Sequence, residues 1–478
     1  MTIFRFLVVT AACAFLILGI PAHGLCSDTV LDGSQLSVVW ALPFFGLLLS
    51  IALWPVINPQ FWEAHYGKIT AVWSTFLVVG LLTQVAPQIL LHEVLETVFN
   101  TYLPFVILLV ALFAVTGGIH LQGNLAGTPL INTGIIFVAT ALASWVGTTG
   151  ASMLFIRPLL RANMYRRYRA HSVIFFIVLA ANVGGSLTPL GDPPIFLGFL
   201  AGMDFFWTTI HMFGPMTFLV ISLLLVHYLL DAYLYRKEDH ELLERHRDQT
   251  VTFKLEGWQV NLPLLLGIAG SVLLSGTWKP GIQIHLFGGV SMELQNIVRD
   301  FLLLTIVVLS GRLTDFSIRE RNAFTWDPMR EVAKLFLGIF ICLIPILAIL
   351  KAGKDGDLGF LVDILHTEDG KPDNIMYFWM TGLLSTLLDN APTFLVFFNI
   401  AGGDAQILMN EMSQTLLAIL CGTVFMGANT YVSNAPNLMV RSLAENLGVR
   451  MPSFFAYTGI VLGMLLPPLF IFTLIWLR

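Results

Sequence analysis

Long apolar windows recur along almost the whole chain and constrain its fold more than any other feature. A helix needs roughly 20 apolar residues to cross about 30 Å of hydrocarbon. Ten such windows are present, and only 12% of the 478 residues are charged. They are 36–57, 69–89, 102–120, 172–200, 213–235, 259–276, 297–315, 331–350, 413–440 and 453–477. The sequence therefore predicts an all-α polytopic membrane protein.

The first 24 residues leave two interpretations open. They contain Arg5, an apolar run and the segment PAHG, in which Ala22 and Gly24 have the small side chains found before a cleavage point. The same run is nearly long enough to remain as an additional first helix. We favour a cleaved signal peptide and keep a retained N-terminal helix as the alternative.

Lysine and arginine are distributed unevenly among the segments that connect the windows. Eighteen of the 25 lie in 58–68, 157–171, 236–258, 312–334 and 441–452. Only four lie in the intervening segments 22–35, 90–101, 201–212, 277–298, 351–374 and 399–412. Because short basic connections stay in the cytoplasm, the first group is predicted to be cytoplasmic and the second external.

Two further apolar windows, 129–160 and 375–398, have polar centres. The alternation of charge is preserved only if each window enters and leaves the membrane on the same side. We therefore predict two re-entrant hairpins at these positions.

The chain divides near residue 250 into two halves with the same order of segments. The predicted repeats are 36–235 and 259–477, joined by a cytoplasmic connector at 236–258. The segment after the first hairpin, RPLLRANMYRRYRAH, holds five arginines, whereas its counterpart NIAGGDAQILMNEM holds no lysine or arginine. The halves therefore have inverted topology. Each is predicted to contain five transmembrane helices, one of them unwound in mid-membrane, and one re-entrant hairpin.

The repeat is supported by two separate alignments. Placing SWVGTTGAS (144–152) on STLLDNAPT (385–393) requires an offset of 241 residues. Placing GGSLTPLGDPP (184–194) on GANTYVSNAPN (427–437) requires an offset of 243. Since the two offsets agree within two residues, we expect the hairpins and the interrupted spans to correspond.

The interrupted spans are predicted to face a polar site. Within hydrocarbon every backbone N–H and C=O needs a partner, so a broken helix is tolerated only inside protein or beside a watery cavity. Proline ends a helix and glycine permits turns, and the resulting half-helix ends can attract an anion or a cation. Corresponding breaks in inverted halves indicate a transporter's binding site. The predicted helix-break residues are Gly184, Gly185, Pro189, Gly191, Pro193, Gly427 and Pro436.

Hydroxyl and amide side chains concentrate at the hairpin centres and the breaks. Oxygen ligands suit a hard alkali cation, and the absence of His and Cys from these segments argues against a transition metal. For any single residue, the alternative role is a hydrogen bond between helices. The candidate ion- or substrate-binding residues are Ser144, Thr148, Thr149, Ser152, Asn182, Ser186, Thr188, Asn390, Thr393, Asn429, Thr430, Ser433 and Asn434.

Asp192 and Asp389 are the candidate coupling residues. An ionised carboxylate is costly at mid-membrane depth, so such a group takes up either a proton or a cation. It can therefore exchange H⁺ for Na⁺. The alternative is that each aspartate caps the N-terminus of a half-helix by accepting hydrogen bonds from free amides. The two roles are compatible.

Four motifs resemble the signature regions of the ion transporter superfamily: SWVGTTGAS, GGSLTPLGDPP, LLDNAPTFLVF and GANTYVSNAPNLMV. This superfamily includes NhaD-type sodium/proton antiporters, arsenite permeases and divalent-anion/sodium symporters. The resemblance covers most of the chain after residue 36. Its GDPP and LDNAPT elements are most similar to the antiporter and arsenite-permease branches, and the whole chain resembles proteins labelled sodium:proton antiporter or citrate transporter. The resemblance implies a homodimer built on a scaffold domain and an elevator-like movement of a transport domain.

The hairpin tips depart from the symporter branch. In that branch the tips carry Ser-Asn-Thr motifs that bind Na⁺ and carboxylate. Here the corresponding segments are Thr148-Thr149-Gly150 and Asp389-Asn390-Ala391. Asp389 would place a negative charge where a substrate carboxylate docks, which disfavours a carboxylate substrate.

We predict a multi-pass secondary active transporter of the bacterial inner membrane that exchanges Na⁺ for H⁺ by competition at the two aspartates. No cofactor and no nucleic-acid partner are expected. The alternative is sodium-coupled uptake of citrate, another dicarboxylate or another oxyanion, held by the half-helix N-termini. ATP does not drive the transport, because the GxxxxGK[ST] motif is absent.

A remote alternative is an intramembrane aspartyl protease, which needs two close carboxylates that share a proton. Its known pattern resembles YD plus GxGD. This chain offers LD at 388–389 and PLGD at 189–192, which lack the tyrosine and the first glycine. We therefore do not expect an enzyme.

Overall fold

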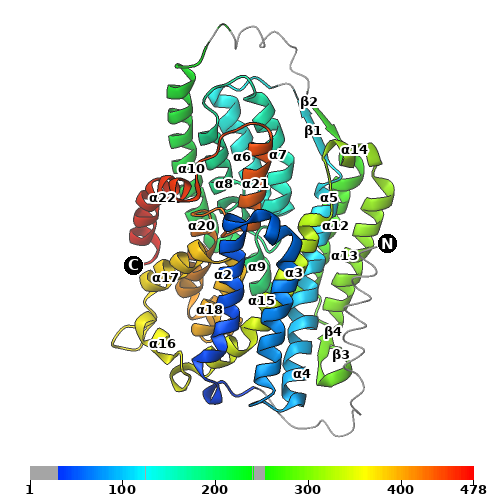
Figure 1. Ribbon diagram of the computed structural model, residues 1–478, viewed down its shortest axis with the longest axis vertical. Helices are drawn as coiled ribbons and strands as arrows, with labels where there is room; N and C mark the ends of the chain where they lie inside the picture. Colours follow the sequence, from blue (N-terminus) through cyan, green and yellow to red (C-terminus); the bar gives the residue numbers. More distant parts are fainter. Residues whose placement is uncertain (1–30, 124, 240, 242–252) are drawn as a thin grey trace.

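The computed structural model describes residues 31–478 except 124, 240 and 242–252 (Figure 1). The predicted signal peptide or additional helix at 1–24 lies outside these residues, and so does much of the predicted connector at 236–258. The regular secondary structure of the described residues is helical apart from two small antiparallel sheets, β1–β2 and β3–β4.

The elements follow one another along the chain in two comparable series. The first series is α2 (Leu42–Ile57), α3 (Pro59–Leu81), α4 (Pro87–Glu96), η4 (Thr97–Tyr102), α5 (Leu103–Thr116), β1 (His120–Gly123), α6 (Pro129–Val146), α7 (Thr148–Ala162), α8 (Ala170–Leu179), η5 (Val183–Gly185), α9 (Pro193–Leu200) and α10 (Trp207–Tyr235). The second is β2 (Phe253–Glu256), α12 (Trp258–Thr277), β3 (Gln283–His285), β4 (Ser291–Glu293), α13 (Leu294–Leu313), α14 (Phe316–Arg321), α15 (Asp327–Lys351), α16 (Gly359–Leu365), α17 (Asn374–Leu387), α18 (Asn390–Ile400), α19 (Ala405–Asn410), α20 (Ser413–Met426), α21 (Ala435–Asn446) and α22 (Phe454–Trp476).

Eight helices of the described residues are long and apolar enough to cross a membrane. They are Val38–Pro55, Pro87–Thr116, Pro129–Val146, Trp207–Tyr235, Trp258–Thr277, Leu294–Leu313, Asp327–Lys351 and Phe454–Trp476. All but Pro129–Val146 overlap the windows predicted as spans. The protein is thus an all-α, multi-pass membrane protein, as the sequence predicts.

The helices between residues 59 and 116 begin and end at other positions than the sequence predicts. Residues 90–101, expected to be an external connection, belong to α4 and η4 and continue into α5 as one helix of 30 residues. The π-helical turn η4 allows this continuation just before Pro104, where the backbone must adjust its hydrogen bonding. Only residues 69–81 of the window predicted at 69–89 belong to α3, which already begins at Pro59; a turn follows, and α4 begins at Pro87.

Both interrupted windows are broken in the structure. α8 ends at Leu179, and after η5 and a turn the chain starts α9 at Pro193. In the second half α20 ends at Met426, and irregular chain runs from 427 to 434 before α21 begins. The segments fold in this way because Pro193 and Pro436 stand in the first turns of α9 and α21, where a missing N–H is tolerated.

The windows with polar centres each form two helices joined by a sharp turn. α6 and α7 meet at Gly147, whose φ of 79° suits glycine. α17 and α18 meet at Leu388 and Asp389. In Figure 1, α6 and α7 lie in the upper part of the view and α17 and α18 in the lower part, with α9 between the two pairs. α6 alone is long enough to cross a membrane, so the re-entrant course of the hairpins stays a prediction.

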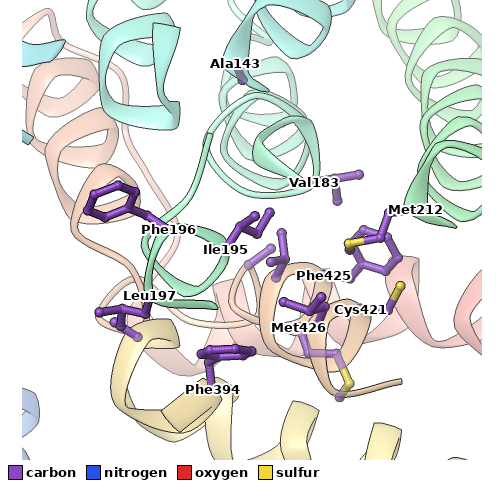
Figure 2. Packing of buried hydrophobic residues seen from close by; sticks show 14 of the residues in the cluster. Ala143, Val183, Ile195, Phe196, Leu197, Met212, Phe394, Cys421, Phe425 and Met426 are labelled. Atoms are coloured by element: carbon purple, nitrogen blue, oxygen red, sulfur yellow. The ribbon is translucent and has the colours of Figure 1, made fainter. Parts of the chain in front are cut away.

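The buried core joins the two halves of the chain. Figure 2 shows Ile195 and Leu197 of α9 close to Phe394 of α18 and Phe425 of α20. These four side chains are 1% exposed or less. The broken helices are therefore enclosed by protein, which is the setting that interrupted backbone requires at membrane depth.

Candidate ion- and substrate-binding site

A cavity of about 90 Å³, here called the central cavity, lies where the hairpin tips meet the breaks. Gly191 from the first break and Asn434 from the second both line it. Its other walls are largely apolar and come from α5, with Phe105 and Leu112, and from α15, with Phe336. A polar end formed by four chain segments thus faces an apolar vestibule.

Four helices begin at the central cavity. Their first residues or N-caps line it: Thr148 of α7, Pro193 of α9, Asp389 before α18 and Ala435 of α21. Each helix N-terminus carries partial positive charge. The arrangement therefore favours negative charge at this end of the cavity, whether from the protein's own carboxylates or from a bound anion.

Asp192 is the most enclosed ionisable group of the cavity, with 2% of its surface exposed. Asn390 Nδ2 donates to its Oδ2 at 3.0 Å. Its Oδ1 accepts from Thr148 Oγ1 and from Asn434 Nδ2, each at 3.4 Å. The carboxylate thus contacts the first hairpin, the second hairpin and the second break. Because all three partners are neutral, its charge is solvated by dipoles and not neutralised.

Asp192 stands at the N-cap position of α9 without capping it. The first two residues of the helix are Pro193 and Pro194, which have no N–H to donate. The side chain of Asp192 thus does not take the alternative role of capping α9. Its oxygens remain available for contacts across the cavity.

Asp389 caps α18 as the sequence allows, since its Oδ1 accepts a hydrogen bond from the Ala391 amide at 3.1 Å. Its side chain is only half-buried and also lines the central cavity. One carboxylate oxygen is therefore occupied by the helix, and the group is less enclosed than Asp192.

Amide side chains connect the two breaks directly. Asn182 Nδ2 donates to Asn437 Oδ1 at 2.7 Å, and Asn434 Nδ2 donates to Asn182 Oδ1 at 3.1 Å. Asn437 in turn donates to the carbonyls of Gly427 and Thr430 at 3.0 and 2.9 Å. Asn437 is one of the polar residues that the sequence places at the second break, and here it holds that break together.

The first hairpin is hydrogen-bonded to the first break. Ser144 Oγ donates to the Gly184 carbonyl at 2.5 Å, and Thr188 Oγ1 donates to the Ser144 carbonyl. At the hairpin tip, the Thr148 amide donates to the Gly191 carbonyl at 2.9 Å. These bonds satisfy much of the interrupted backbone and hold the start of α7 against the break.

The second hairpin is bonded to the second break in a similar way. Ser385 donates to the Thr423 carbonyl and to Asn390 Oδ1 at 2.7 and 2.8 Å. Thr386 accepts from Asn429 Nδ2 at 2.8 Å through its hydroxyl and from Thr430 Oγ1 at 3.0 Å through its carbonyl. Each half therefore forms one hairpin–break unit, and the amide contacts join the two units.

The structure brings some of the predicted residues to the central cavity and leaves others behind it. Those that line the cavity are Thr148, Thr149, Pro189, Gly191, Asp192, Pro193, Asp389, Asn434 and Pro436. Those that do not are Ser144, Ser152, Asn182, Ser186, Thr188, Asn390, Thr393, Asn429, Thr430, Ser433, Gly184, Gly185 and Gly427. Most of the second set hold the hairpins and breaks together. Their binding roles stay predictions.

Two of the buried candidate residues keep an oxygen without a partner. Ser152 Oγ and Asn429 Oδ1 form no hydrogen bond with any described residue. A buried polar atom of this kind is unusual and costly unless something else contacts it. The two oxygens are therefore available to a ligand or to water next to the hairpins.

The described lining of the central cavity contains two carboxylates and no lysine, arginine or histidine. A fully ionised polycarboxylate would meet two negative charges there with only helix dipoles to oppose them. A cation or a proton would instead be attracted by the two carboxylates and would meet no positively charged side chain in the described lining. The charge of the lining therefore favours a positively charged occupant.

A second buried polar network lies away from this cavity and was missed by the sequence analysis. Asp231 of α10 is fully buried and forms an ion pair with Arg166, while His171 Nε2 lies 2.9 Å from its Oδ1. His171, His227 and Asp231 have the donor atoms of a metal site. The guanidinium on Asp231 opposes a metal ion there. The signal was visible in the sequence, because His227 and Asp231 stand four residues apart in an apolar helix.

A family model described as "Putative citrate transport" matches residues 33–477. The chain belongs to this family. The family is part of the ion transporter superfamily, so the resemblance of the four motifs is confirmed. No curated protein matches the chain. Membership of a transport family makes the cavity, with its breaks and hairpins, the place to look for the transported species.

Proposed function

We propose that this member of the citrate transport family is a secondary active transporter of the bacterial inner membrane that exchanges Na⁺ for H⁺ in its central cavity. The observation that carries the proposal is the lining: Asp192 and Asp389 face a cavity whose described lining has no positively charged side chain. Such a site is neutral overall only when it holds protons or cations.

Competition at Asp192 explains how the two ions are coupled. The amides of Asn390 and Asn434 and the hydroxyl of Thr148 donate to its carboxylate when it is ionised. A Na⁺ ion takes oxygen ligands of the kind that surround this group, whereas a proton binds the carboxylate alone. Only one of the two can occupy Asp192 at a time, so entry of one ion releases the other.

The fold supports movement of the hairpin–break units as one body. The two units contact each other through Asn182, Asn434 and Asn437. The vestibule of the cavity belongs to α5 and α15, which are outside both units. We propose that these two helices are part of a scaffold, that the units form the moving transport domain, and that the transporter is a homodimer.

The inverted repeat agrees with the helix boundaries. α7 begins at Thr148 and α18 at Asn390, and α9 begins at Pro193 and α21 at Ala435. Both pairs are 242 residues apart, the same separation as that between Asp192 and Asn434. This value lies between the two offsets found from the motifs and supports a duplicated unit.

Transport of citrate together with a cation is the second candidate. It is favoured by the description of the family and by the four helix N-termini at the cavity. In this case Na⁺ bound beside the aspartates compensates their charge, and a carboxylate of the substrate lies against the N-termini of α7 and α21. The two candidates differ in whether the anion is needed for ion movement.

Purified protein in proteoliposomes distinguishes the two candidates. A pH gradient is imposed, Na⁺ is added with or without citrate, and the gradient is followed with a pH-sensitive dye while uptake of labelled citrate is measured in parallel. Na⁺/H⁺ exchange predicts that Na⁺ alone dissipates the gradient. If labelled citrate accumulates with a Na⁺ gradient and Na⁺ alone leaves the pH gradient intact, the exchange proposal is wrong. Asp327→Asn, an exposed acid at the start of α15, is the matched control for substitutions of Asp192.

A further inference from the structure

A second cavity, here called the outer cavity, lies at the opposite end of α9 from Asp192 and has a volume of about 430 Å³. It is lined by the chain between α9 and α10, by the end of α12 and by the start of α13. The charge count assigns 201–212 and 277–298 to the external side, and the structure brings both segments to this cavity. The outer cavity therefore belongs to the external face in the predicted topology.

Arg299 of α13 gives the outer cavity a buried positive charge. Its side chain is 1% exposed. Nε donates to Asp300 Oδ1 at 2.8 Å, and Nη1 donates to Asn296 Oδ1 at 3.1 Å. Nη2 has no hydrogen-bond partner among the described residues. A guanidinium has five N–H donors in a planar fork, so the two N–H groups of Nη2 are left for a ligand.

The surroundings of Arg299 select the chemistry of that ligand. Lys279 also lines the outer cavity and is exposed at its edge, whereas Asp204 and Glu293 contribute two acids. Glu293 accepts a hydrogen bond from Gln295 Nε2 at 2.6 Å. Among the buried side-chain atoms of the described lining, Arg299 Nη2 is the one that has no partner. Carboxylate oxygens are the acceptors whose geometry fits such a fork.

Two aromatic rings separate the outer cavity from the central one. The Arg299 guanidinium lies 5.9 Å from the centroid of Phe196, which lines the central cavity. Phe196 stacks on Phe199 with centroids 6.1 Å apart, and Phe199 lines the outer cavity. A ligand at Arg299 is therefore one aromatic layer from the transport site.

We propose that the outer cavity is a binding site for a small organic carboxylate, held by Arg299 on the external side of the Phe196–Phe199 layer. The site deepens the second candidate of the proposed function, because it supplies a guanidinium donor for a carboxylate, which the described lining of the central cavity lacks. Its existence does not depend on Na⁺/H⁺ exchange, since it is formed by other residues.

The first test measures binding of citrate to the purified full chain by isothermal titration calorimetry. Wild type is expected to bind citrate, and Arg299→Lys, which keeps the charge next to Asp300 but loses the fork, is expected to bind at least about tenfold more weakly, the loss expected for one charged hydrogen bond. Arg312→Gln, at the exposed cytoplasmic end of the same helix, is the matched control and should bind as wild type does. Equal affinity of Arg299→Lys and wild type overturns the proposal, and so does absence of citrate binding to wild type.

A second variant guards against a folding defect. In Arg299→Gln/Asp300→Asn both charges of the ion pair are removed, so no uncompensated charge is left buried. A variant that is monodisperse and has lost citrate binding supports the site. One that is monodisperse and retains wild-type affinity contradicts it.

A third measurement locates the ligand and separates this site from the central one. Thr277 lines the outer cavity and is exposed, so Thr277→Cys can be labelled from outside by a membrane-impermeant thiol reagent. Citrate should slow this labelling by several-fold, and should do so equally when Asp192→Asn is also present. If citrate does not slow the labelling, any bound carboxylate lies elsewhere and the proposal is wrong. Failure of Na⁺/H⁺ exchange alone leaves the protection unchanged, so the two proposals fail separately.

Discussion

In the first half of the protein the carboxylate stands at the break in the helix, whereas in the second half it stands at the tip of the hairpin. Asp192 precedes α9, and the equivalent position before α21 is the neutral Asn434. Asp389 precedes α18, and the equivalent residue before α7 is Gly147. In the proposed repeat the two acids thus stand at non-equivalent places, and they have different surroundings.

The difference in surroundings indicates a difference in role. The carboxylate of Asp192 accepts no hydrogen bond from its own helix and three from the side chains of other segments. The carboxylate of Asp389 accepts one from its own helix, and this residue is more exposed. We therefore expect Asp192 to dominate coupling and Asp389 to combine a structural task with a contribution to the charge of the cavity.

The two hairpins also differ at their first residues, at the starts of α6 and α17. A substitution among the partners of these residues should change the stability of the protein more than any other substitution proposed below. Asn132 at the start of α6 donates to Asp231, which is paired with Arg166, whereas Asn374 at the start of α17 accepts from Thr415 at 2.7 Å. Asp231→Asn takes the closest acid from the buried Arg166 guanidinium and leaves it Glu238 Oε1 at 3.6 Å, so it should destabilise the fold by about 3 kcal/mol, the low end for a broken buried ion pair. Thr415→Val removes one neutral bond and should cost about 1 kcal/mol.

Thermal unfolding in detergent, followed by intrinsic fluorescence, compares the two variants with wild type. The midpoint should fall much further for Asp231→Asn than for Thr415→Val. Equal shifts would show that the ion pair adds nothing to the anchoring of the first hairpin.

The next largest effect concerns exchange. Asp192→Asn keeps the size of the side chain but removes its charge, and we expect Na⁺-dependent dissipation of a pH gradient to fall by about 100-fold or more, because contacts to a charged group contribute about 1.5–3 kcal/mol each. Asp389→Asn should lower the rate of exchange by only about tenfold, since asparagine can still cap α18. Asp327→Asn should behave as wild type. If Asp192→Asn and Asp389→Asn both exchange ions at the wild-type rate, the two carboxylates have structural roles only.

A swap of the two N-cap residues tests whether the halves are interchangeable. Asn434 Nδ2 lies 3.4 Å from Asp192 Oδ1 across the cavity. Asp192→Asn/Asn434→Asp therefore moves the carboxylate to the second break and leaves an amide opposite it. We expect about a tenth of wild-type exchange, clearly above Asp192→Asn alone. If the double variant is as inactive as the single one, the position of the acid matters and not only its presence in the cavity.

Particular residues show why the sequence predicts some of this arrangement. The breaks follow from prolines and glycines within apolar windows, which act locally. Pro193 and Pro194 remove two of the first three amides of α9, which the sequence alone shows, whereas the Ile195 amide donates to the Asp192 carbonyl and not to its side chain. Asn434 is a candidate from the polar residues of the second break, but its contact with Asp192, 242 residues away in the chain, is not contained in any local pattern.

Other features depend on packing that local patterns do not contain. The segment 90–101 has polar residues typical of a connection, yet it continues as helix through the π-helical turn before Pro104. The apolar vestibule uses α5 and α15, whose residues look like those of any lipid-facing span. The pair Arg166–Asp231 links the segment between α7 and α8 to α10. The one local sign of this pair in the sequence is the charged Asp231 inside an apolar window.

The smallest effect is expected from two glycines at the breaks. A Cβ on Gly427 would lie 2.1 Å from Asn390 Oδ1, a side chain that can move, whereas a Cβ on Gly191 would lie 2.0 Å from the backbone oxygen of Gly185. Gly427→Ala should therefore displace the Asn390 amide from Asp192 and slow exchange by about a few-fold, because Thr148 and Asn434 still donate to this carboxylate. Gly191→Ala must shift the first break itself and should lower the yield of folded protein.

Gly134→Ala is the control for both substitutions, because it lies within α6 and a Cβ there meets nothing within 4 Å. Exchange rate per folded molecule and the fraction of monodisperse protein are measured separately for the three variants. At the first break Gly191 lies against the backbone of Gly185, whereas at the second Gly427 lies against the side chain of Asn390. Only the second break can therefore accept a methyl group by moving a side chain, without unfolding. A Gly191→Ala protein that folds and exchanges as well as Gly427→Ala would mean that both breaks are equally adaptable, and that the asymmetry between the halves lies in their charges alone.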